Sequence, residues 1–369
     1  MRAVRYLKYA LILCLFPFAA AAQEEPLRLE IGGYAKWYAA GTYRRSKQNS
    51  PAYNRFDVMG DAQIEFSGYA ALSQDYAVGL TAQLKGGTES ADNDGFANEY
   101  ALYADTKEGR TWDEVFLTFD SPAGRLFLGN VKNVAYQMAV TAPTISALGV
   151  EESQLTRLSG AAPLTTIPVY DDVGAKIQYI SPTFSGFTIG AGYMPANNTN
   201  GHDATVLKSG GLDSSLVATL LYETQTDHGF FNVSVSGARF EQKTGKAGKS
   251  LSVGAQFAEG NHTIGASYMK ALNGDLDNGA DGAVHGGRTQ TVSVGYVYDL
   301  GLAAAGVNYI VQTGENKSGN LRQSALQTTV RYRLGRGVDL FCELAYVNDN
   351  TAQNERDTFG SAAGFDLTF

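Results

Sequence analysis

The chain has 369 residues and a formal net charge of −8, with 18% charged residues and 42 glycines. This negative balance argues against a nucleic-acid partner, because contacts to phosphate need clustered lysine and arginine. Only two cysteines are present, Cys14 and Cys342, which excludes a disulfide-rich fold. Abundant glycine, tyrosine and phenylalanine with few charges are typical of a protein built from extended strands.

Residues 1–22 have the pattern of a secretory signal peptide. Three basic residues precede an uncharged apolar run that ends in alanines. The run is too short for a membrane-spanning helix, which needs about 20 apolar residues. We expect cleavage after Ala22, with Ala20 as the alternative. The mature chain would then be one domain, 23–369, and removal of the three basic residues would change its net charge from −8 to −11.

Sixteen stretches of the mature chain alternate apolar with small or polar residues, the period of two that a β-strand requires. Val292, Val294 and Tyr296, for example, alternate with serine and glycine. No stretch shows a sustained helical period. The predicted strands are 27–43, 57–72, 76–85, 113–119, 125–129, 173–180, 186–193, 216–223, 230–238, 250–257, 262–269, 291–299, 302–311, 325–333, 338–347 and 357–369.

The connections between these strands alternate in length. Tight turns such as 73–75 and 121–124 contrast with long polar segments such as 86–109 and 272–287. This arrangement is typical of an outer-membrane barrel. A soluble β-sandwich is the alternative, but the polar face of the strands is poor in lysine and glutamate. We predict an all-β fold: a transmembrane antiparallel β-barrel of about 16 strands, with lipid outside and water inside.

The chain ends on a strand whose apolar residues share one parity. Phe365, Leu367 and Phe369 alternate with small or polar residues. Because an unpaired sheet edge is costly in hydrocarbon, the last strand must pair with the first. These three side chains are therefore predicted to face lipid, with Phe369 at the membrane interface.

Three motifs resemble those of a known family. They are RLFLGN at 125–130, VGAKIQYISPTFSGFTIGAGY at 173–193, and GFDLTF at 364–369. Together they are similar to Gram-negative general porins, most of all to the alphaproteobacterial type. The resemblance implies a 16-stranded outer-membrane barrel, a homotrimer, and a third external loop folded into the pore. It also implies that the closing strand, with Phe369, is recognised by the barrel-assembly machinery. Asn130 departs from the arginine common at that position.

The segment 131–172 is the candidate constriction. It is too long for an ordinary connection, is rich in alanine and threonine, and shows no alternation. We predict that it folds into the barrel and that its acids line the narrow zone. An external loop packed on its neighbours is the alternative. The acids are Glu151, Glu152, Asp171 and Asp172.

The opposite wall is predicted to carry basic residues, so that a transverse electric field crosses the constriction. Lys36, Arg44 and Lys85 are the candidates at constriction height. The full inward-parity set is Arg28, Lys36, Arg44, Lys85, Arg125, Lys176, Arg331 and Arg333, beside Asp57, Asp61, Glu65 and Glu114.

Motifs for catalysis or a cofactor are weak. The four histidines lie in or beside predicted turns, and no nucleophile or nucleotide motif is present. Two acidic, glycine-rich loops lack the glutamate that completes a calcium loop. We predict no cofactor, but leave open weak divalent-cation binding that bridges to lipopolysaccharide. The residues concerned are Asp92, Asp94, Asp275 and Asp277.

The sequence thus predicts a passive diffusion channel for small hydrophilic solutes and ions across the outer membrane, with a mild cation preference. A substrate-selective porin, for a sugar or an anion, is the first alternative. It would carry aromatic residues along the inner wall. A barrel hydrolase is the second alternative and would need a clustered serine, histidine and aspartate.

Overall fold

The computed structural model describes residues 27–46, 55–87, 112–151, 153–158, 161, 164–168, 175–195, 212–242, 247–274, 287–316, 319–351 and 354–369. Sixteen antiparallel strands form a closed barrel, which confirms the predicted fold class. The predicted signal peptide lies outside the described residues. The strands are β1 (Arg28–Ser46), β2 (Phe56–Ser73), β3 (Tyr76–Gly87), β4 (Trp112–Ser121), β5 (Gly124–Asn130), β6 (Ala175–Ile180), β7 (Phe187–Met194), β8 (Leu212–Thr226), β9 (Gly229–Gln242), β10 (Gly248–Glu259), β11 (His262–Gly274), β12 (Gly287–Asp299), β13 (Ala303–Asn316), β14 (Gly319–Gly335), β15 (Val338–Thr351) and β16 (Asn354–Thr368).

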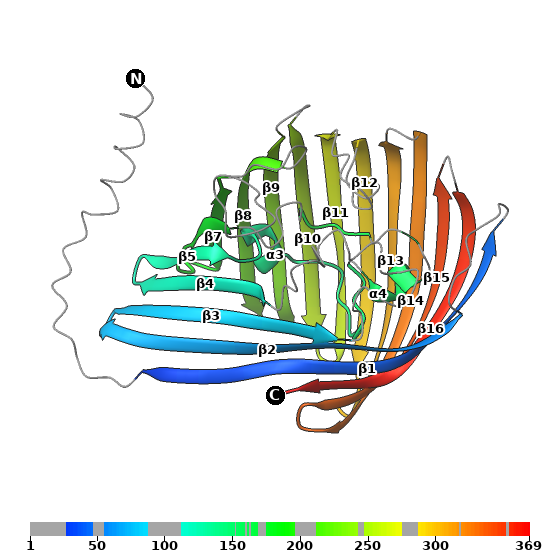
Figure 1. Ribbon diagram of the computed structural model, residues 1–369, viewed down its shortest axis with the longest axis horizontal. Helices are drawn as coiled ribbons and strands as arrows, with labels where there is room; N and C mark the ends of the chain where they lie inside the picture. Colours follow the sequence, from blue (N-terminus) through cyan, green and yellow to red (C-terminus); the bar gives the residue numbers. More distant parts are fainter. Residues whose placement is uncertain are drawn as a thin grey trace.

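Each strand pairs with its neighbours in sequence, and β1 pairs with β16 to close the barrel (Figure 1). The closing register runs from Tyr34 opposite Thr368 to Ser46 opposite Arg356. Just beyond it, the backbone N–H groups of Gly33 and Phe369 each donate to the carbonyl of the other at 3.1 Å. No sheet edge is therefore left open, as a membrane-spanning sheet requires.

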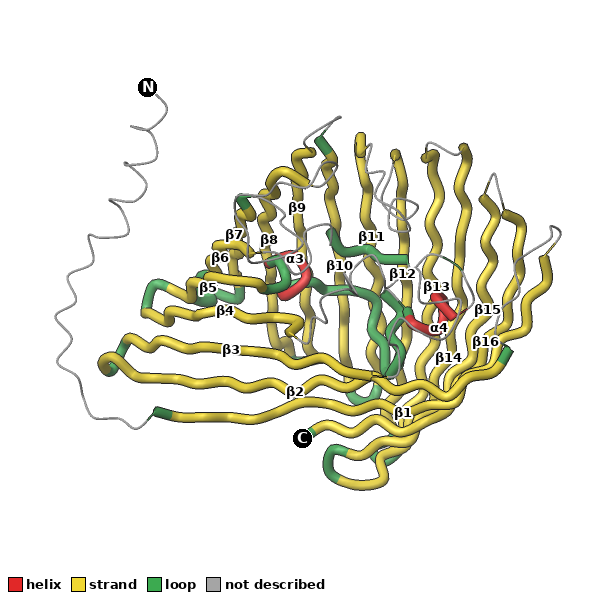
Figure 2. The backbone as a smooth tube through the Cα atoms, in the orientation of Figure 1, coloured by secondary structure: helices red, strands yellow, loops and turns green. Residues whose placement is uncertain are grey.

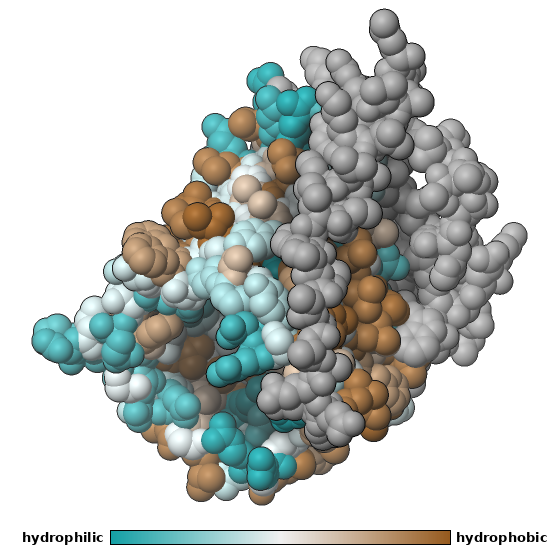
Figure 3. All heavy atoms as spheres, turned by 90° about the vertical axis from the view of Figure 1, so that its left-hand side faces the viewer, coloured by the Kyte–Doolittle hydropathy of each residue, from teal (hydrophilic) through white to brown (hydrophobic). Residues whose placement is uncertain are grey.

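Burial alternates along the strands with the predicted parity. In β7 every second residue is exposed. In β16 Phe365 and Leu367 are exposed, as is Phe369 directly after the strand, while Ala362 is buried. The exposed set is the apolar one, so it forms the lipid-facing surface. Figure 3, which shows the face on the left-hand side of Figure 1, has hydrophobic residues over the outer wall and hydrophilic residues around the hollow.

Several strands are longer than the alternation predicts. β1 continues to Ser46 and β14 begins at Gly319, beyond the predicted ends at 43 and 325. The ladder there is still formed, for example between Glu315 and Asn320. At these ends the outward residues, such as Arg45 and Arg322, are polar, so the alternation fades although the backbone hydrogen bonds continue. Hydrophobic periodicity therefore reports the lipid-covered part of a strand and underestimates its length.

Two short helices interrupt the connection between β5 and β6. They are α3 (Val134–Gln137) and α4 (Gln154–Leu158). Figure 2 shows the green segment that carries them crossing the interior of the barrel instead of extending from its rim. Among the residues that the structure describes, no helix has the length and apolar character needed to cross a membrane.

Candidate pore constriction

We call the described residues between 131 and 168 the inward loop. It leaves the wall after β5 ends at Asn130, and the preceding residue Gly129 has a φ of +137°, in a region that favours glycine. A Cβ atom at Gly129 would lie 2.5 Å from the carbonyl oxygen of Val115 on β4. Glycine is therefore required directly before the end of the strand. The sequence motif at 125–130 carries this information.

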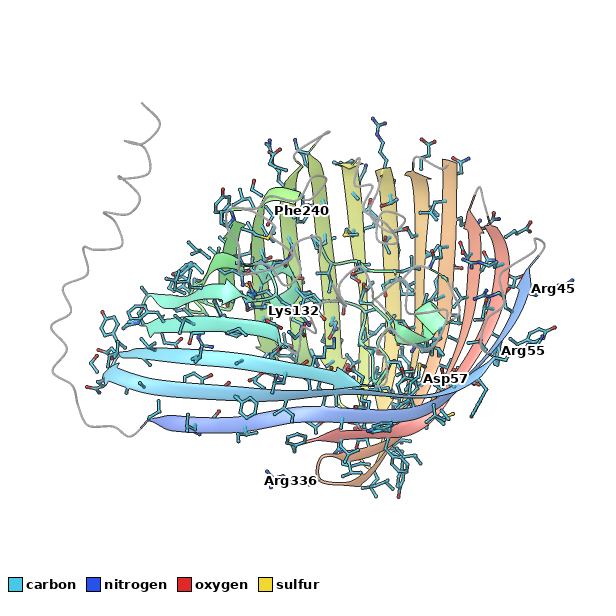
Figure 4. All side chains as sticks on the ribbon, in the orientation of Figure 1. Arg45, Arg55, Asp57, Lys132, Phe240 and Arg336 are labelled. Carbon is cyan, nitrogen blue, oxygen red and sulfur yellow. The ribbon has the colours of Figure 1, made fainter. Side chains whose placement is uncertain are left out.

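The base of the inward loop is tied to the neighbouring strand β6. The Lys176 ammonium donates to the Val131 carbonyl at 2.6 Å, and the Gln178 amide donates to the Lys132 carbonyl at 2.8 Å. Lys176 is 2% exposed, so this predicted wall cation is used to hold the loop. Figure 4 places Lys132 at this inner position, with its ammonium 4.3 Å from the centre of the Tyr136 ring.

Asn133 connects the beginning of the inward loop to its end. Its side-chain oxygen accepts a hydrogen bond from the Tyr136 N–H and caps α3, while its side-chain nitrogen donates to the Pro168 carbonyl at 2.8 Å. Asparagine suits this position because one side chain provides both an acceptor and a donor. The two ends of the loop are thereby held together.

From α3 the loop runs across the inner wall, bound by one polar side chain after another. The Val140 N–H donates to the Ser234 hydroxyl on β9 at 2.8 Å. On β10 and β13, Gln256 and Asn308 donate at 2.7 Å to the carbonyls of Thr141 and Pro143. The small polar inward residues of these strands therefore satisfy a backbone that has no regular secondary structure of its own.

The tip of the inward loop is anchored by Glu343 on β15. One carboxylate oxygen accepts the N–H groups of Ala147 at 2.6 Å and Leu148 at 3.3 Å. The other accepts the Ser146 hydroxyl at 2.8 Å and the Gln327 amide at 2.7 Å. The Glu343 side chain has no exposed surface. This residue was missed by the sequence reasoning, although a glutamate at inward parity in an apolar strand was a signal that could have found it.

Apolar contacts hold the loop on both sides of the barrel. Near its start, α3 contributes Val134 to a buried cluster with Phe240, which Figure 4 labels on β9. Further on, Leu155 of α4 packs in a cluster with Tyr38 of β1 and Phe341 of β15. The described residues of the loop therefore contact the inner wall at both places, instead of packing only outside the barrel.

The loop approaches the wall closely at Gly254 on β10. A Cβ atom at this position would lie 1.6 Å from the Val140 carbonyl oxygen. We expect Gly254→Ala to push the loop inward and to lower the free energy of unfolding by about 1–3 kcal/mol, the usual cost of overpacking. Thermal unfolding and single-channel conductance measure these two effects.

The matched control for this prediction is Gly237→Ala on β9. Gly237 also lies inside a strand, but nothing lies within 4 Å of a Cβ built there. The control should leave conductance unchanged. Equal effects of the two substitutions on conductance would contradict the close approach of the loop at Gly254.

The carboxylate of Glu151 forms hydrogen bonds within the inward loop. Its carboxylate accepts hydrogen bonds from the backbone N–H and the hydroxyl of Thr166, and that hydroxyl lies 2.7 Å from the Ser267 hydroxyl on β11. Burial raises the pKa of the Glu151 carboxyl above its usual value, although the hydrogen bonds act in the opposite direction. The role predicted for Glu151 in the narrow zone stays a prediction, and Glu152, Asp171 and Asp172 lie outside the residues whose side chains are described.

The three predicted wall cations Lys36, Arg44 and Lys85 lie on the inward parity of β1 and β3. Lys36 lies directly opposite Asp61 on β2 and opposite Asp366 on β16. Its ammonium is 4.7 Å from the centre of the Tyr34 ring. The structure thus places carboxylates on both sides of a cation that the sequence reasoning had assigned to a basic wall.

The family model for Gram-negative porins matches residues 10–352 of the chain. The chain belongs to the Gram-negative porin family. This porin is a passive channel of the outer membrane in a Gram-negative bacterium, as the resemblance of its motifs predicted. A comparison with curated proteins found no match.

Solved porin structures share this fold. An anion-selective porin from Comamonas acidovorans is 13% identical, with a TM-score of 0.64, and 93% of this chain and 100% of that chain are covered. OmpF of Salmonella typhi, in complex with daunomycin, is 15% identical, with a TM-score of 0.64 and coverages of 92% and 97%. A mutant porin of Rh. blastica is 12% identical, with a TM-score of 0.55 and coverages of 93% and 100%.

Proposed function

We propose that this porin is a general diffusion channel for small hydrophilic solutes and ions, with a mild cation preference. The observation that carries the proposal is the inward loop, which crosses the lumen and is bound to the wall by β9, β10, β13 and β15. A loop held in this way narrows the channel without a dedicated ligand site. Charged and polar side chains on the remaining wall then act on passing solutes.

The packing of the inner aromatic residues favours a general diffusion channel over a sugar-selective channel. Tyr38 is 2% exposed, and its ring lies 6.3 Å from that of Phe341 beneath the loop. Phe116 and Phe127 pair with each other, with ring centres 5.8 Å apart. These aromatic rings pack against other aromatic side chains of the protein. A sugar-selective wall would instead present their faces to the lumen.

The channel function is tested in planar bilayers under a potassium chloride gradient. We expect single-channel steps and a zero-current potential whose sign shows potassium passing more easily than chloride. Uptake of uncharged hydrophilic solutes into proteoliposomes should be rapid for the smallest and fall with solute size. Saturable uptake of one sugar would instead support the selective alternative.

We further propose that the porin is a homotrimer. Small outward residues meet on the strands that close the barrel: Ala39 lies directly opposite Ala363, and Ala35 lies on the same face of β1, four residues before Ala39. Such a surface allows a close approach between barrels. Ala363→Trp should convert the native trimer to monomers in native mass measurements, whereas Ala255→Trp, on the lipid-facing side of β10, should not. A wild-type particle with the mass of one chain would exclude the trimer.

We also propose that this porin has no catalytic activity, and that the barrel-assembly machinery and lipopolysaccharide are its other partners. A barrel hydrolase is disfavoured because membership of a channel family accounts for the fold and the inward loop. Recognition by the barrel-assembly machinery is supported by the terminal strand that closes the barrel. Lipopolysaccharide contact with the outer wall stays a prediction. The possible cation ligands Asp92, Asp94, Asp275 and Asp277 lie outside the described residues.

A further inference from the structure

We propose that the inner wall formed by β1, β2 and β16 sets the ion preference of this channel. On this wall carboxylates surround Lys36 and form a path for cations. The inference deepens the proposed cation preference and rests on it. It differs from the arrangement that the sequence suggested, in which acids on the loop face a basic wall.

The path begins with a column of acids on β2. Asp57, Asp61 and Glu65 share the inward parity and recur at every fourth residue. A strand rises about 3.3 Å per residue, so neighbouring carboxylates lie about 13 Å apart and the column spans about 26 Å. Because the strands of such barrels tilt by about 35–45°, the column covers roughly 20 Å of an apolar band about 25 Å tall. One strand therefore carries negative charge through most of the depth of the membrane.

A cavity on the inner wall joins this column to the closing strand. It has a volume of about 410 Å³, and its lining includes Tyr34, Lys36, Gln63, Glu65 and Asp366. Two carboxylates and one ammonium group thus face the same space. A small cation can occupy it, because low-dielectric walls on either side concentrate the field of the carboxylates.

The hydrogen bonds and ion pairs of Glu65 and Asp366 do not fully neutralise the negative charge of this wall. Glu65 accepts the Gln83 amide at 2.8 Å and the Ser67 hydroxyl at 3.1 Å, and both of these donors are neutral. Asp366 is bound by Arg331 at 2.6 Å, but the same guanidinium group lies 3.5 Å from Asp339. One arginine is therefore shared by two acids.

Asp61 and Lys36 complete the arrangement. Asp61 lies opposite Lys36 in the β1–β2 ladder and accepts the Tyr34 hydroxyl at 3.1 Å. Lys36 is thus placed between Asp61 on one side and Asp366 on the other. We infer that it moderates the cation preference of the wall and that its removal strengthens this preference.

Glu151 of the inward loop and its anchor Glu343 on β15 have another use. The carboxylate of Glu151 is bound by the N–H and hydroxyl of Thr166, and that of Glu343 is bound by four donors from the loop and β14. Both hold the loop in place. Glu343 has no exposed surface, whereas Glu65 and Asp366 line the cavity on the inner wall.

The experiment compares three variants of the full-length porin in planar bilayers under a potassium chloride gradient. In Asp61→Asn/Glu65→Gln the permeability ratio of potassium to chloride should fall by about twofold or more, because two unit charges leave the ion path at close range. In Lys36→Gln the ratio should rise. The control Glu241→Gln/Glu259→Gln removes two carboxylates from the outer face and should leave the ratio unchanged.

Two measurements distinguish a loss of folding from a change in ion preference. Heat-modifiable migration and native mass show whether each variant has folded and assembled, and Lys36→Gln tests the wall even if the double acid variant fails to fold. The proposal is overturned if folded variants of the wall change the ratio no more than the outer-face control does. If the wild type prefers chloride, the proposed cation preference fails, whereas opposite shifts in the two wall variants would still support control by this wall.

Discussion

Replacing Glu343 with alanine should release the tip of the inward loop and lower the free energy of unfolding by about 3–5 kcal/mol. The substitution leaves the Ala147 N–H without its buried acceptor. It also removes one of the two acceptors of the Leu148 N–H and of the Gln327 amide, which then keep only the Ser146 hydroxyl. Each unsatisfied buried donor costs about 1–3 kcal/mol, and the values are not fully additive. Urea unfolding of the barrel in lipid measures the loss.

Channel recordings provide the second measurement for Glu343→Ala. A loop that has lost its anchor moves within the lumen, so we expect frequent current substates where the wild type shows steady conductance. Glu259→Ala, at the exposed turn end of β10, is the matched control and should behave as the wild type. If folded Glu343→Ala channels show no additional current substates, the other contacts with the wall suffice to position the loop.

Deleting Phe369 should lower the amount of folded porin in the outer membrane by about tenfold or more. The deletion removes two backbone hydrogen bonds between Phe369 and Gly33, at the point where the barrel closes. At about 1 kcal/mol each, these bonds alone change the closing equilibrium more than tenfold. The exposed ring at the membrane interface is lost as well. Quantification of the heat-modifiable band in outer-membrane fractions checks the result.

Two further variants separate the causes. Phe369→Ser keeps the backbone but removes the ring, so a level near that of the deletion would assign the effect to the aromatic side chain. Phe359→Ser removes an outward ring at the opposite end of β16 and should be much less harmful. Wild-type levels of folded porin after deletion of Phe369 would contradict a decisive role for the last residue.

The sequence by itself determined the architecture of this porin. Strict alternation in segments such as 291–299 predicted strands and their lipid-facing residues, because a strand between lipid and water must separate the two kinds of side chain. The absence of an edge in lipid predicted that the strand ending in Phe369 pairs with the first strand. The motif at 125–130, by its resemblance to porins, predicted where the chain leaves the wall, and Gly129 within it has the positive φ that favours glycine.

Only the tertiary structure decided which charges hold the loop and which face the lumen. Glu343 contacts Ala147 and Ser146, almost 200 residues earlier in the chain. Alternation assigns a residue to a face, but the register between strands decides its neighbours, as it does for Lys36 between Asp61 and Asp366. That register follows from the tilt and stagger with which all sixteen strands close, a property of the whole barrel that no single strand contains.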